Sequence, residues 1–145
     1  MYLGQLVISV LRIMNIEVIK RNSVRLLRFN NELSKFNSIN QSFLCNFNHL
    51  LNDFNNDDSV KCLILTGNSK SFFVGLDDNE FKNKKFSDLY ASDYLSDFHF
   101  INQFRKPIIG ALNGYAVCLL LFHLFECLYV ITVLVRWRFG ISYGL

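Results

Sequence analysis

The sequence lacks several features that would assign a function at once. It has one proline and seven glycines in 145 residues, and no proline-rich linker or low-complexity tract appears. Its four cysteines have no C-x-x-C spacing and no histidine at ligand distance, so we expect no metal site. Each cysteine has apolar neighbours, which favours buried free thiols over disulfides. These cysteines are Cys45, Cys62, Cys118 and Cys127.

The sequence also has no concentration of charge of one sign. Fifteen basic and twelve acidic residues give a net charge of +3, and the basic residues are spread along the chain. A nucleic-acid backbone requires a clustered stripe of lysine and arginine, so we expect no nucleic-acid partner. A hydrophobic content of 51% over 145 residues instead predicts one domain with a real core.

One long apolar run raises the question of a membrane span. It extends from Tyr115 to Val135, is long enough to cross a bilayer and is followed by two arginines. His123 and Glu126 oppose insertion, because an acidic group near the centre costs about 2.5–3.5 kcal/mol. We therefore expect no membrane association, and a non-catalytic protein anchored by this run is kept as an alternative. The first residues are apolar but short and lack a cleavage site, so they do not predict a signal peptide.

Two early segments have clear patterns. From Ile16 to Asn30, β-branched and apolar residues alternate on either side of the letters RNS, which predicts a β-hairpin. Over Gln41–Phe54 the apolar positions recur at helical spacing, which predicts an amphipathic helix. Asn40 or Ser42 is expected to cap that helix.

The middle of the chain alternates strand and helix patterns. Ser59–Gly67 is a continuous apolar run bounded by turn residues, which predicts a strand buried on both faces. Phe72–Val74 and Lys106–Leu112 predict two further strands, and Ser87–Phe104 has helical spacing. This order predicts an α/β fold in which crossover helices cover a largely parallel sheet.

Two stretches contain a glycine but no obvious nucleophile or phosphate loop nearby. They read FFVGLDDNEF from Phe72 and RKPIIGALNGYAVC from Arg105. A glycine just past a strand lets the backbone turn and leaves amide N–H groups pointing into open space. Together with the preceding VKCLILTG, they resemble the enoyl-CoA hydratase/isomerase family, also called the crotonase family. The resemblance covers about Ile16 to Val117 and includes a strand ending in T-G, an F-x-x-G-x-D turn and an N-G-x-A motif.

The resemblance implies an α/β fold, a crotonase-like spiral of ββα units that is incomplete at the C-terminus. Residues 16–145 are then a partial domain, and residues 1–15 are an N-terminal extension. Members of the family act on acyl thioesters of coenzyme A, so the implied partner is acyl-CoA and coenzyme A is part of the substrate rather than a cofactor. The difficult intermediate is an enolate, whose charge two backbone N–H donors can stabilise on the thioester oxygen.

By position, the resemblance assigns these catalytic donors to the backbones of Leu76 and Leu119. It also implies substrate contacts from four residues that shape the two turns. These are Val74, beside the adenine ring, Gly75, Asp77 and Gly114. Without the family, each glycine is explained as an ordinary turn, and Lys106 as a solvated cation or a structural partner. In the family reading the chemistry lies in the main chain, which is why neither stretch needs a reactive side chain.

The chain departs from the family pattern beyond Val117. Cys118 stands where the family has a glycine that lets a helix terminus approach the thioester. Phe122 occupies the position of a hydratase glutamate and cannot transfer a proton. Glu126 is explained as an ordinary helix carboxylate. No acidic residue follows it, so the downstream base of the Δ3-Δ2-enoyl-CoA isomerases is not found.

The bulky apolar residues after Cys118 resemble those isomerases of fatty acid oxidation more than the hydratases. We therefore expect an acyl-CoA-binding protein of isomerase ancestry, truncated and weakly active or inactive, with a hydratase fragment as the alternative. The family implies a homo-oligomer for the full-length form, located in mitochondria or peroxisomes, although no clear targeting signal is found. The histidines are isolated in sequence and are expected to pack on the surface or in the core. They are His49, His99 and His123.

Overall fold

A hairpin of strands β2 (Ile16–Arg21) and β3 (Val24–Phe29) lies within the main sheet of the protein, as the sequence predicts. Asn22 turns this hairpin with a φ of 51°, a left-handed conformation that asparagine tolerates well. The computed structural model describes residues 9–13, 15–31, 37–75, 77 and 99–116 of the chain. Every structural statement below concerns these residues.

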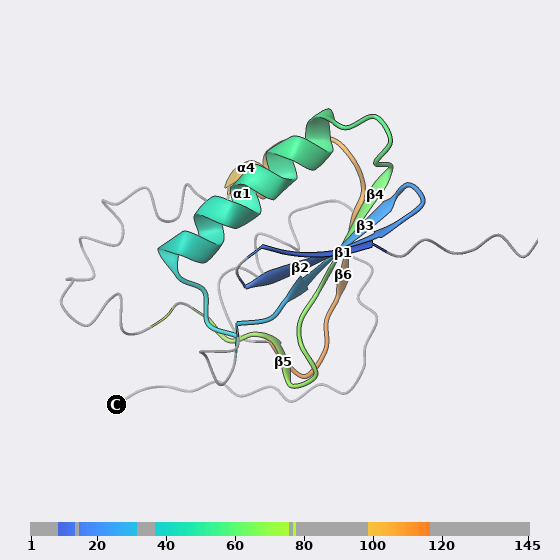
Figure 1. Cartoon of the computed structure of the whole chain (residues 1–145). Coiled ribbons are helices and arrows are strands. Elements are labelled where there is room, and N and C mark those ends of the chain that lie inside the picture. Colours follow the sequence, from blue (N-terminus) through green and yellow to red (C-terminus); the bar gives the residue numbers. More distant parts are fainter. Residues whose placement is uncertain (1–8, 14, 32–36, 76, 78–98, 117–145) are drawn as a thin grey trace, which may run out of the picture.

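The main sheet has five strands in the order β1-β2-β3-β4-β6 (Figure 1). β1 (Ser9–Ile13) pairs antiparallel with β2 and forms one edge. β4 (Cys62–Thr66) pairs parallel with β3, and β6 (Ile108–Ala111) pairs parallel with β4. The sheet is therefore mixed rather than largely parallel. The difference arises because β1, which the sequence pattern does not reveal, adds a second antiparallel pairing.

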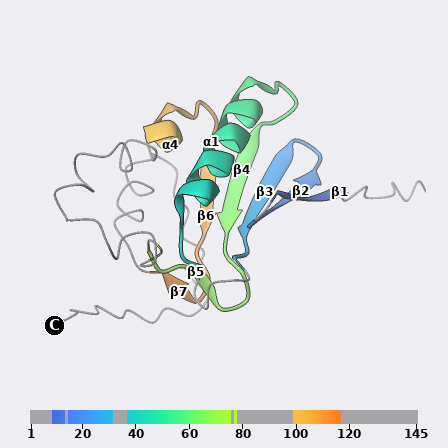
Figure 2. The same cartoon turned by 60° about the vertical axis from the view of Figure 1, so that its left-hand side comes forward.

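Helix α1 (Gln41–Asn56) covers one face of this sheet (Figure 2). Asn40 is its N-cap, because the Asn40 side chain accepts a hydrogen bond of 2.8 Å from the backbone N–H of Phe43. The helix ends two residues beyond the predicted Phe54. Its buried side chains are the apolar ones that recur at helical spacing, as expected. They are Phe43, Leu44, Phe47, Leu50, Leu51 and Phe54.

The core lies between α1 and the sheet. Phe29 is at its centre, in edge-to-face contact with the rings of Phe43, Phe47 and Phe72. In β4, however, buried residues alternate with half-buried ones, so the prediction that this strand is buried on both faces is wrong. One face of β4 lies under α1, and no described element covers the other face.

A short second sheet joins the two glycine-bearing stretches. β5 (Ser71–Phe73) pairs parallel with β7 (Tyr115–Ala116), and every residue of β5 is buried. Helix α4 (His99–Gln103) is the described end of the predicted helix Ser87–Phe104, the rest of which lies outside the described residues. Among the helices described, none is long and apolar enough to cross a membrane. The apolar run starting at Tyr115 lies outside the described part from residue 117 onward, so its role is not tested.

The two described cysteines are free thiols, but they are less buried than predicted. Cys45 is exposed on α1, and Cys62 is half-buried on β4. Cys45 is exposed because it falls between the apolar positions of the helix and therefore faces away from the sheet. Burial raises the pKa of the Cys62 thiol. His49 is exposed on α1, which agrees with its expected surface role.

Lys106 is a structural partner at the end of α1. Its ammonium group donates hydrogen bonds of 2.6 Å to the backbone carbonyls of Phe54 and Asp57, where the helix terminates. A cation at this place satisfies carbonyl groups that lack a helical partner and interacts well with the helix dipole.

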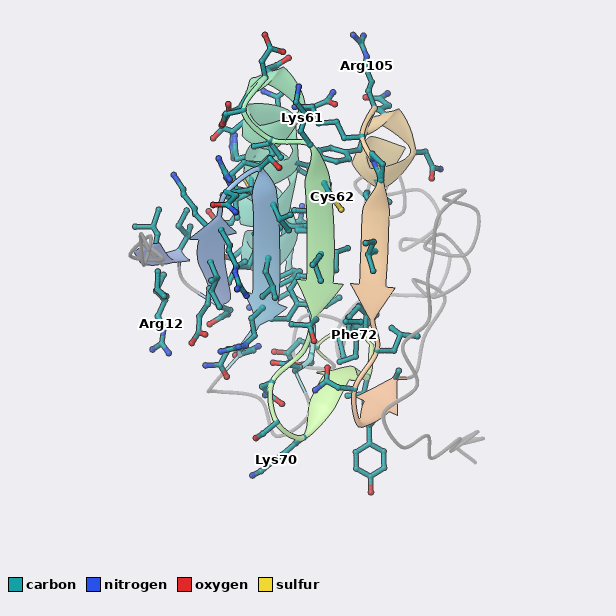
Figure 3. The ribbon with its side chains drawn as sticks, turned by 90° about the vertical axis from the view of Figure 1, so that its right-hand side faces the viewer. Arg12, Lys61, Cys62, Lys70, Phe72 and Arg105 are labelled. Carbon is teal, nitrogen blue, oxygen red and sulfur yellow. The ribbon has the colours of Figure 1, made fainter. Side chains whose placement is uncertain are left out.

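We predict that Lys106→Met will lower the free energy of unfolding by about 1–2 kcal/mol, since it removes two charge-assisted hydrogen bonds. Chemical denaturation measures this difference. Lys61→Met is the matched control, because Lys61 is exposed and is also near this end of the sheet (Figure 3). Equal stability of the two variants would show that the Lys106 contacts contribute nothing.

Candidate functional site

The structure brings the two glycine-bearing stretches side by side. In the β5–β7 pairing, Ser71 lies opposite Tyr115 and Phe73 lies opposite Ala116. The two strands run in the same direction, so the segments that leave them also start from neighbouring points. Two stretches about forty residues apart in sequence thus enter one region of the molecule (Figure 2).

The first turn, which follows β5, is anchored to the segment before α1. Gly75 has a φ of 129°, a conformation that side chains rarely adopt. Its carbonyl accepts a hydrogen bond from the N–H of Ile39, and the N–H of Asp77 donates to the carbonyl of Ile39, both at 2.8 Å. Ile39 therefore holds the turn on both sides of position 76. Asp77 contributes to this turn through its backbone.

The second turn, before β7, depends on Gly114. This glycine has a φ of 64° and forms an isolated bridge with Ser71. A Cβ at this position would overlap the carbonyl oxygen of Lys70 and lie 2.6 Å from its carbonyl carbon. The same Lys70 carbonyl accepts a hydrogen bond from the N–H of Tyr115 at 3.2 Å. Gly114 thus allows the close backbone approach that joins β7 to β5.

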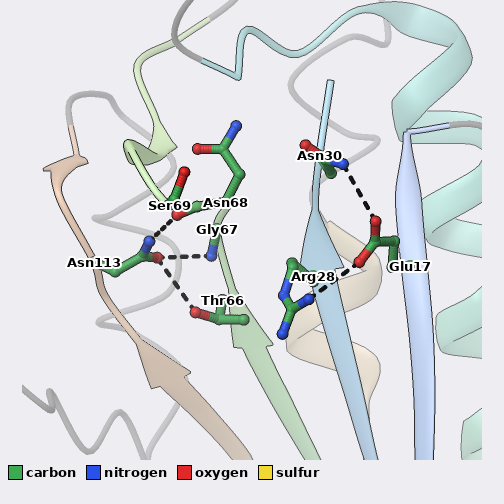
Figure 4. Close-up of a pocket in the computed structure, with 8 residues that line it drawn as sticks. All are labelled: Glu17, Arg28, Asn30, Thr66, Gly67, Asn68, Ser69 and Asn113. Carbon is green, nitrogen blue, oxygen red and sulfur yellow. Dashed lines mark hydrogen bonds and ion pairs between the residues drawn. The ribbon is translucent and has the colours of Figure 1, made fainter. Parts of the chain in front are cut away.

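Asn113 links the ends of β4 and β6 (Figure 4). Its side-chain oxygen accepts hydrogen bonds from the N–H of Gly67 at 2.8 Å and from the Thr66 hydroxyl at 3.3 Å. Its side-chain amide donates to the carbonyl of Asn68. These bonds fix the turn that carries the chain from β4 into β5, so Asn113 has a positioning role.

Asn37 is only 2% exposed, and its buried side chain hydrogen-bonds to several backbone segments near the first turn. Its side-chain amide donates to the carbonyls of Phe29, Ser71 and Phe72 at 2.8–3.1 Å. Its side-chain oxygen accepts from the N–H of Asn31 at 2.7 Å. One side chain therefore ties the end of β3 to β5. Sequence reasoning missed this role, because Asn37 lies between the predicted hairpin and the predicted helix, where no pattern marks it.

Four of the predicted site residues lie within the described structure, and the two turns bring them to neighbouring positions. They are Val74, Gly75, Asp77 and Gly114. The proposed backbone donors, Leu76 and Leu119, lie outside the described residues, as do Cys118, Phe122 and Glu126. In the part of the chain that is described, no group of three or more acidic, cysteine or histidine side chains is arranged to hold a metal ion.

Comparison with known proteins gives a consistent result. Residues 20–119 match a family model described as enoyl-CoA hydratase/isomerase. The mitochondrial enoyl-CoA hydratase of Pongo abelii is 35% identical over 97 residues, which cover 67% of this chain and 33% of the relative. The chain therefore spans about a third of the length of this curated relative.

Solved structures show the same fold. DspI of Pseudomonas aeruginosa superposes with a TM-score of 0.64 at 27% identity, over 72% of this chain and 40% of that protein. OdaA of the same organism superposes with a TM-score of 0.67 at 24% identity, over 80% of this chain and 46% of that protein. The second likeness, at this identity, shows the fold alone.

Proposed function

The chain belongs to the enoyl-CoA hydratase/isomerase family, with the crotonase fold, and from this premise we propose that it binds an acyl thioester of coenzyme A. In this proposal the backbone N–H groups of Leu76 and Leu119 bind the thioester oxygen. Val74, Gly75, Asp77 and Gly114 form the adjoining turns and contact the substrate. Coenzyme A is part of the substrate, and no separate cofactor is required.

The register of β5 and β7 is the observation that carries this proposal. Phe73 lies opposite Ala116 in a parallel pair. Leu76 is three residues beyond Phe73, and Leu119 is three residues beyond Ala116. Because the paired strands run in the same direction, the segments that carry the two donors leave β5 and β7 from neighbouring points, which supports a shared site.

Two backbone donors suit the chemistry of a thioester. Removing the α-proton of an acyl-CoA leaves an enolate, and its negative charge concentrates on the thioester oxygen. Preorganised N–H donors stabilise that charge, and one donor in a comparable oxyanion hole contributes roughly 2.7–4 kcal/mol. Main-chain donors need no reactive side chain, which fits the composition of both turns.

We further propose Δ3-Δ2-enoyl-CoA isomerase ancestry with weak or no activity in the chain as given. Phe122 supports this, because it stands in place of a hydratase glutamate and cannot transfer a proton. A hydratase origin is the second candidate, and the hydratase name of the Pongo abelii relative favours it. That name also supports a mitochondrial location, with peroxisomes as the alternative that the family resemblance implies. A homo-oligomer is proposed for the full-length form only.

Replacing Leu76 with proline tests the donor, because proline has no backbone N–H. The probe is a 3-ketoacyl thioester of coenzyme A, which forms a stabilised enolate with its own ultraviolet absorbance. We expect the unmodified chain to increase the enolate absorbance at a fixed pH and to gain thermal stability with this probe. Leu76→Pro should weaken binding by about a hundredfold, a factor that corresponds to the loss of one oxyanion donor.

Leu76→Ala is the matched control, since it shortens the side chain and keeps the N–H donor. Its enolate signal should remain close to that of the unmodified chain. Equal losses in the proline and alanine variants would indicate a side-chain effect and contradict a backbone donor at Leu76. A flat titration of the unmodified chain with this thioester would refute acyl-CoA binding itself.

A further inference from the structure

An open cavity of about 520 Å³, lined mostly by residues of polar type, lies at the carboxyl ends of the parallel strands (Figure 4). Its lining residues come from the start of β2, from the ends of β3 and β4, and from the turns that follow β4 and β6. Ligands commonly bind beyond the carboxyl ends of strands in α/β sheets, and this volume is typical of small-molecule sites. The lining residues used below are Glu17, Arg28, Thr66, Asn68, Ser69 and Asn113.

Several side-chain oxygens that line the cavity already accept hydrogen bonds from the protein. Glu17 accepts from Arg12 at 2.7 Å, and from Arg28 and Asn30 at 3.2 Å. The side-chain oxygen of Asn68 accepts from the N–H groups of Lys70 and Ser71 at 2.9 and 3.0 Å. The side-chain oxygen of Asn113 is shared between Gly67 and Thr66, as described above. The side-chain oxygens of Glu17, Asn68 and Asn113 therefore already accept hydrogen bonds from the protein.

Donors, by contrast, remain available. Arg28 uses one terminal nitrogen for Glu17, and its other guanidinium N–H groups have no hydrogen-bond partner among the described residues. The same holds for the side-chain NH₂ of Asn68 and for the Ser69 hydroxyl within the described part. Arg28 and the Asn68–Ser69 turn lie on opposite walls of the cavity (Figure 4). The side chain of Arg28 is 43% exposed, so a ligand can reach it.

Positively charged groups lie at this place. The guanidinium groups of Arg12 and Arg28 both contact the carboxylate of Glu17. The hydrogen bond from Arg12, helped by that from Asn30 and by the positive charges of Arg12 and Arg28, holds the pKa of Glu17 below its usual range. Glu17 therefore stays ionised at neutral pH and does not take a proton from a ligand. Arginine with spare N–H groups suits an oxyanion.

The cavity lies on the side of the sheet opposite the first glycine turn. Glu17, Arg28 and Thr66 are neighbours in register across β2, β3 and β4, and they alternate with the buried residues that pack under α1. Their side chains thus emerge on the face that α1 does not cover. Gly75, in contrast, is hydrogen-bonded to Ile39 at the start of α1.

We propose that this cavity is a binding site for a small oxyanion, the phosphate or carboxylate group of a small molecule, separate from the acyl-CoA site. Arg28 binds the anion through its spare N–H groups, and Asn68 and Ser69 supply further donors. Glu17 orients Arg28 and limits its affinity by competing for the guanidinium. This site does not depend on the proposed acyl-CoA function.

Isothermal titration with sodium phosphate, and in parallel with sodium acetate, tests the site at an ionic strength held constant with chloride. We expect saturable binding of at least one of these anions to the whole chain. Arg28→Gln should weaken it at least tenfold, the effect of losing a charge-assisted hydrogen bond. Arg105→Gln removes the same charge at the opposite end of the sheet and should leave binding unchanged (Figure 3). Glu17→Gln, which releases Arg28, should strengthen binding severalfold.

The Glu17→Gln variant keeps the proposal testable if Arg28→Gln fails to fold, because it predicts a gain rather than a loss. The oxyanion site would be overturned if chloride at equal ionic strength abolished the binding. It would also be overturned if the Glu17→Gln variant bound the anion no more tightly than the unmodified chain. Displacement of bound phosphate by an acyl thioester of pantetheine, which carries no phosphate group, would assign the cavity to the acyl-CoA site and overturn its separate role. Acyl-CoA binding without any anion binding would reject this inference alone and leave the proposed function standing.

Discussion

Replacing Asn37 with aspartate is expected to lower the free energy of unfolding by about 3–5 kcal/mol, the range for an uncompensated buried charge. The two side chains have nearly the same shape, so packing is preserved. The amide of Asn37 donates to three backbone carbonyls, from Phe29, Ser71 and Phe72. A carboxylate cannot donate and would face these carbonyls at a site that is 2% exposed. The loss is a large part of a typical stability of 5–15 kcal/mol.

Chemical denaturation at neutral pH measures this effect. Asn22→Asp is the matched control, because Asn22 also has a left-handed backbone, with a φ of 51° against 60° for Asn37, but is exposed in the β2–β3 turn. The control should change stability by less than about 0.5 kcal/mol. Similar losses in both variants would show that backbone conformation, rather than the buried hydrogen bonds, determines the cost at Asn37.

Replacing Gly114 with alanine is expected to lower the free energy of unfolding by about 3 kcal/mol or more. Its φ of 64° carries a penalty of roughly 1–2 kcal/mol for a residue with a Cβ. The added Cβ would also overlap the backbone carbonyl of Lys70, which cannot move aside as a flexible side chain does. Relief of this overlap requires β7 to separate from β5. We therefore expect the variant to lose the proposed acyl-CoA binding together with stability.

Ser69→Ala is the control for this change, since Ser69 is exposed in the same turn region and should tolerate the loss of its hydroxyl within about 0.5 kcal/mol. Thermal unfolding and a titration with the 3-ketoacyl thioester measure the two expected losses. A Gly114→Ala variant with full stability would show that the β5–β7 junction can relax. If it were stable and still bound the thioester, the contribution of this junction to the site would be refuted.

Local pattern is a reliable guide where a segment forms its own structure. The hairpin over Ile16–Asn30 and the helix beginning at Gln41 are both found, because their apolar spacing and their turn or cap residues agree. β1 was missed because an edge strand has no second neighbour and needs little sequence pattern to add to a sheet. The burial of β4 was overestimated because a continuous apolar run does not reveal how many faces are covered.

The residues of the candidate site also fall into those that the sequence reveals and those that it does not. Gly75 and Gly114 could be found from the sequence because a positive φ restricts the residue type. The hydrogen-bond partners of Asn37 and Asn113 could not be assigned from the sequence. Their hydrogen bonds reach residues more than thirty positions away, and asparagine is frequent throughout this chain. The Arg28 cavity was missed for a related reason, since strand register decides which face Glu17 and Arg28 share.

The sequence by itself determined the family, the amphipathic helix and the two glycine turns, because these depend on residue type and spacing within short segments. Only the tertiary structure decided how the turns meet. The parallel register of β5 and β7 places Phe73 opposite Ala116, and this pairing depends on Asn37, Asn113 and the space beside Gly114. Hydrogen bonds between distant backbone segments leave no period in the sequence, so their partners become known only when the chain is folded.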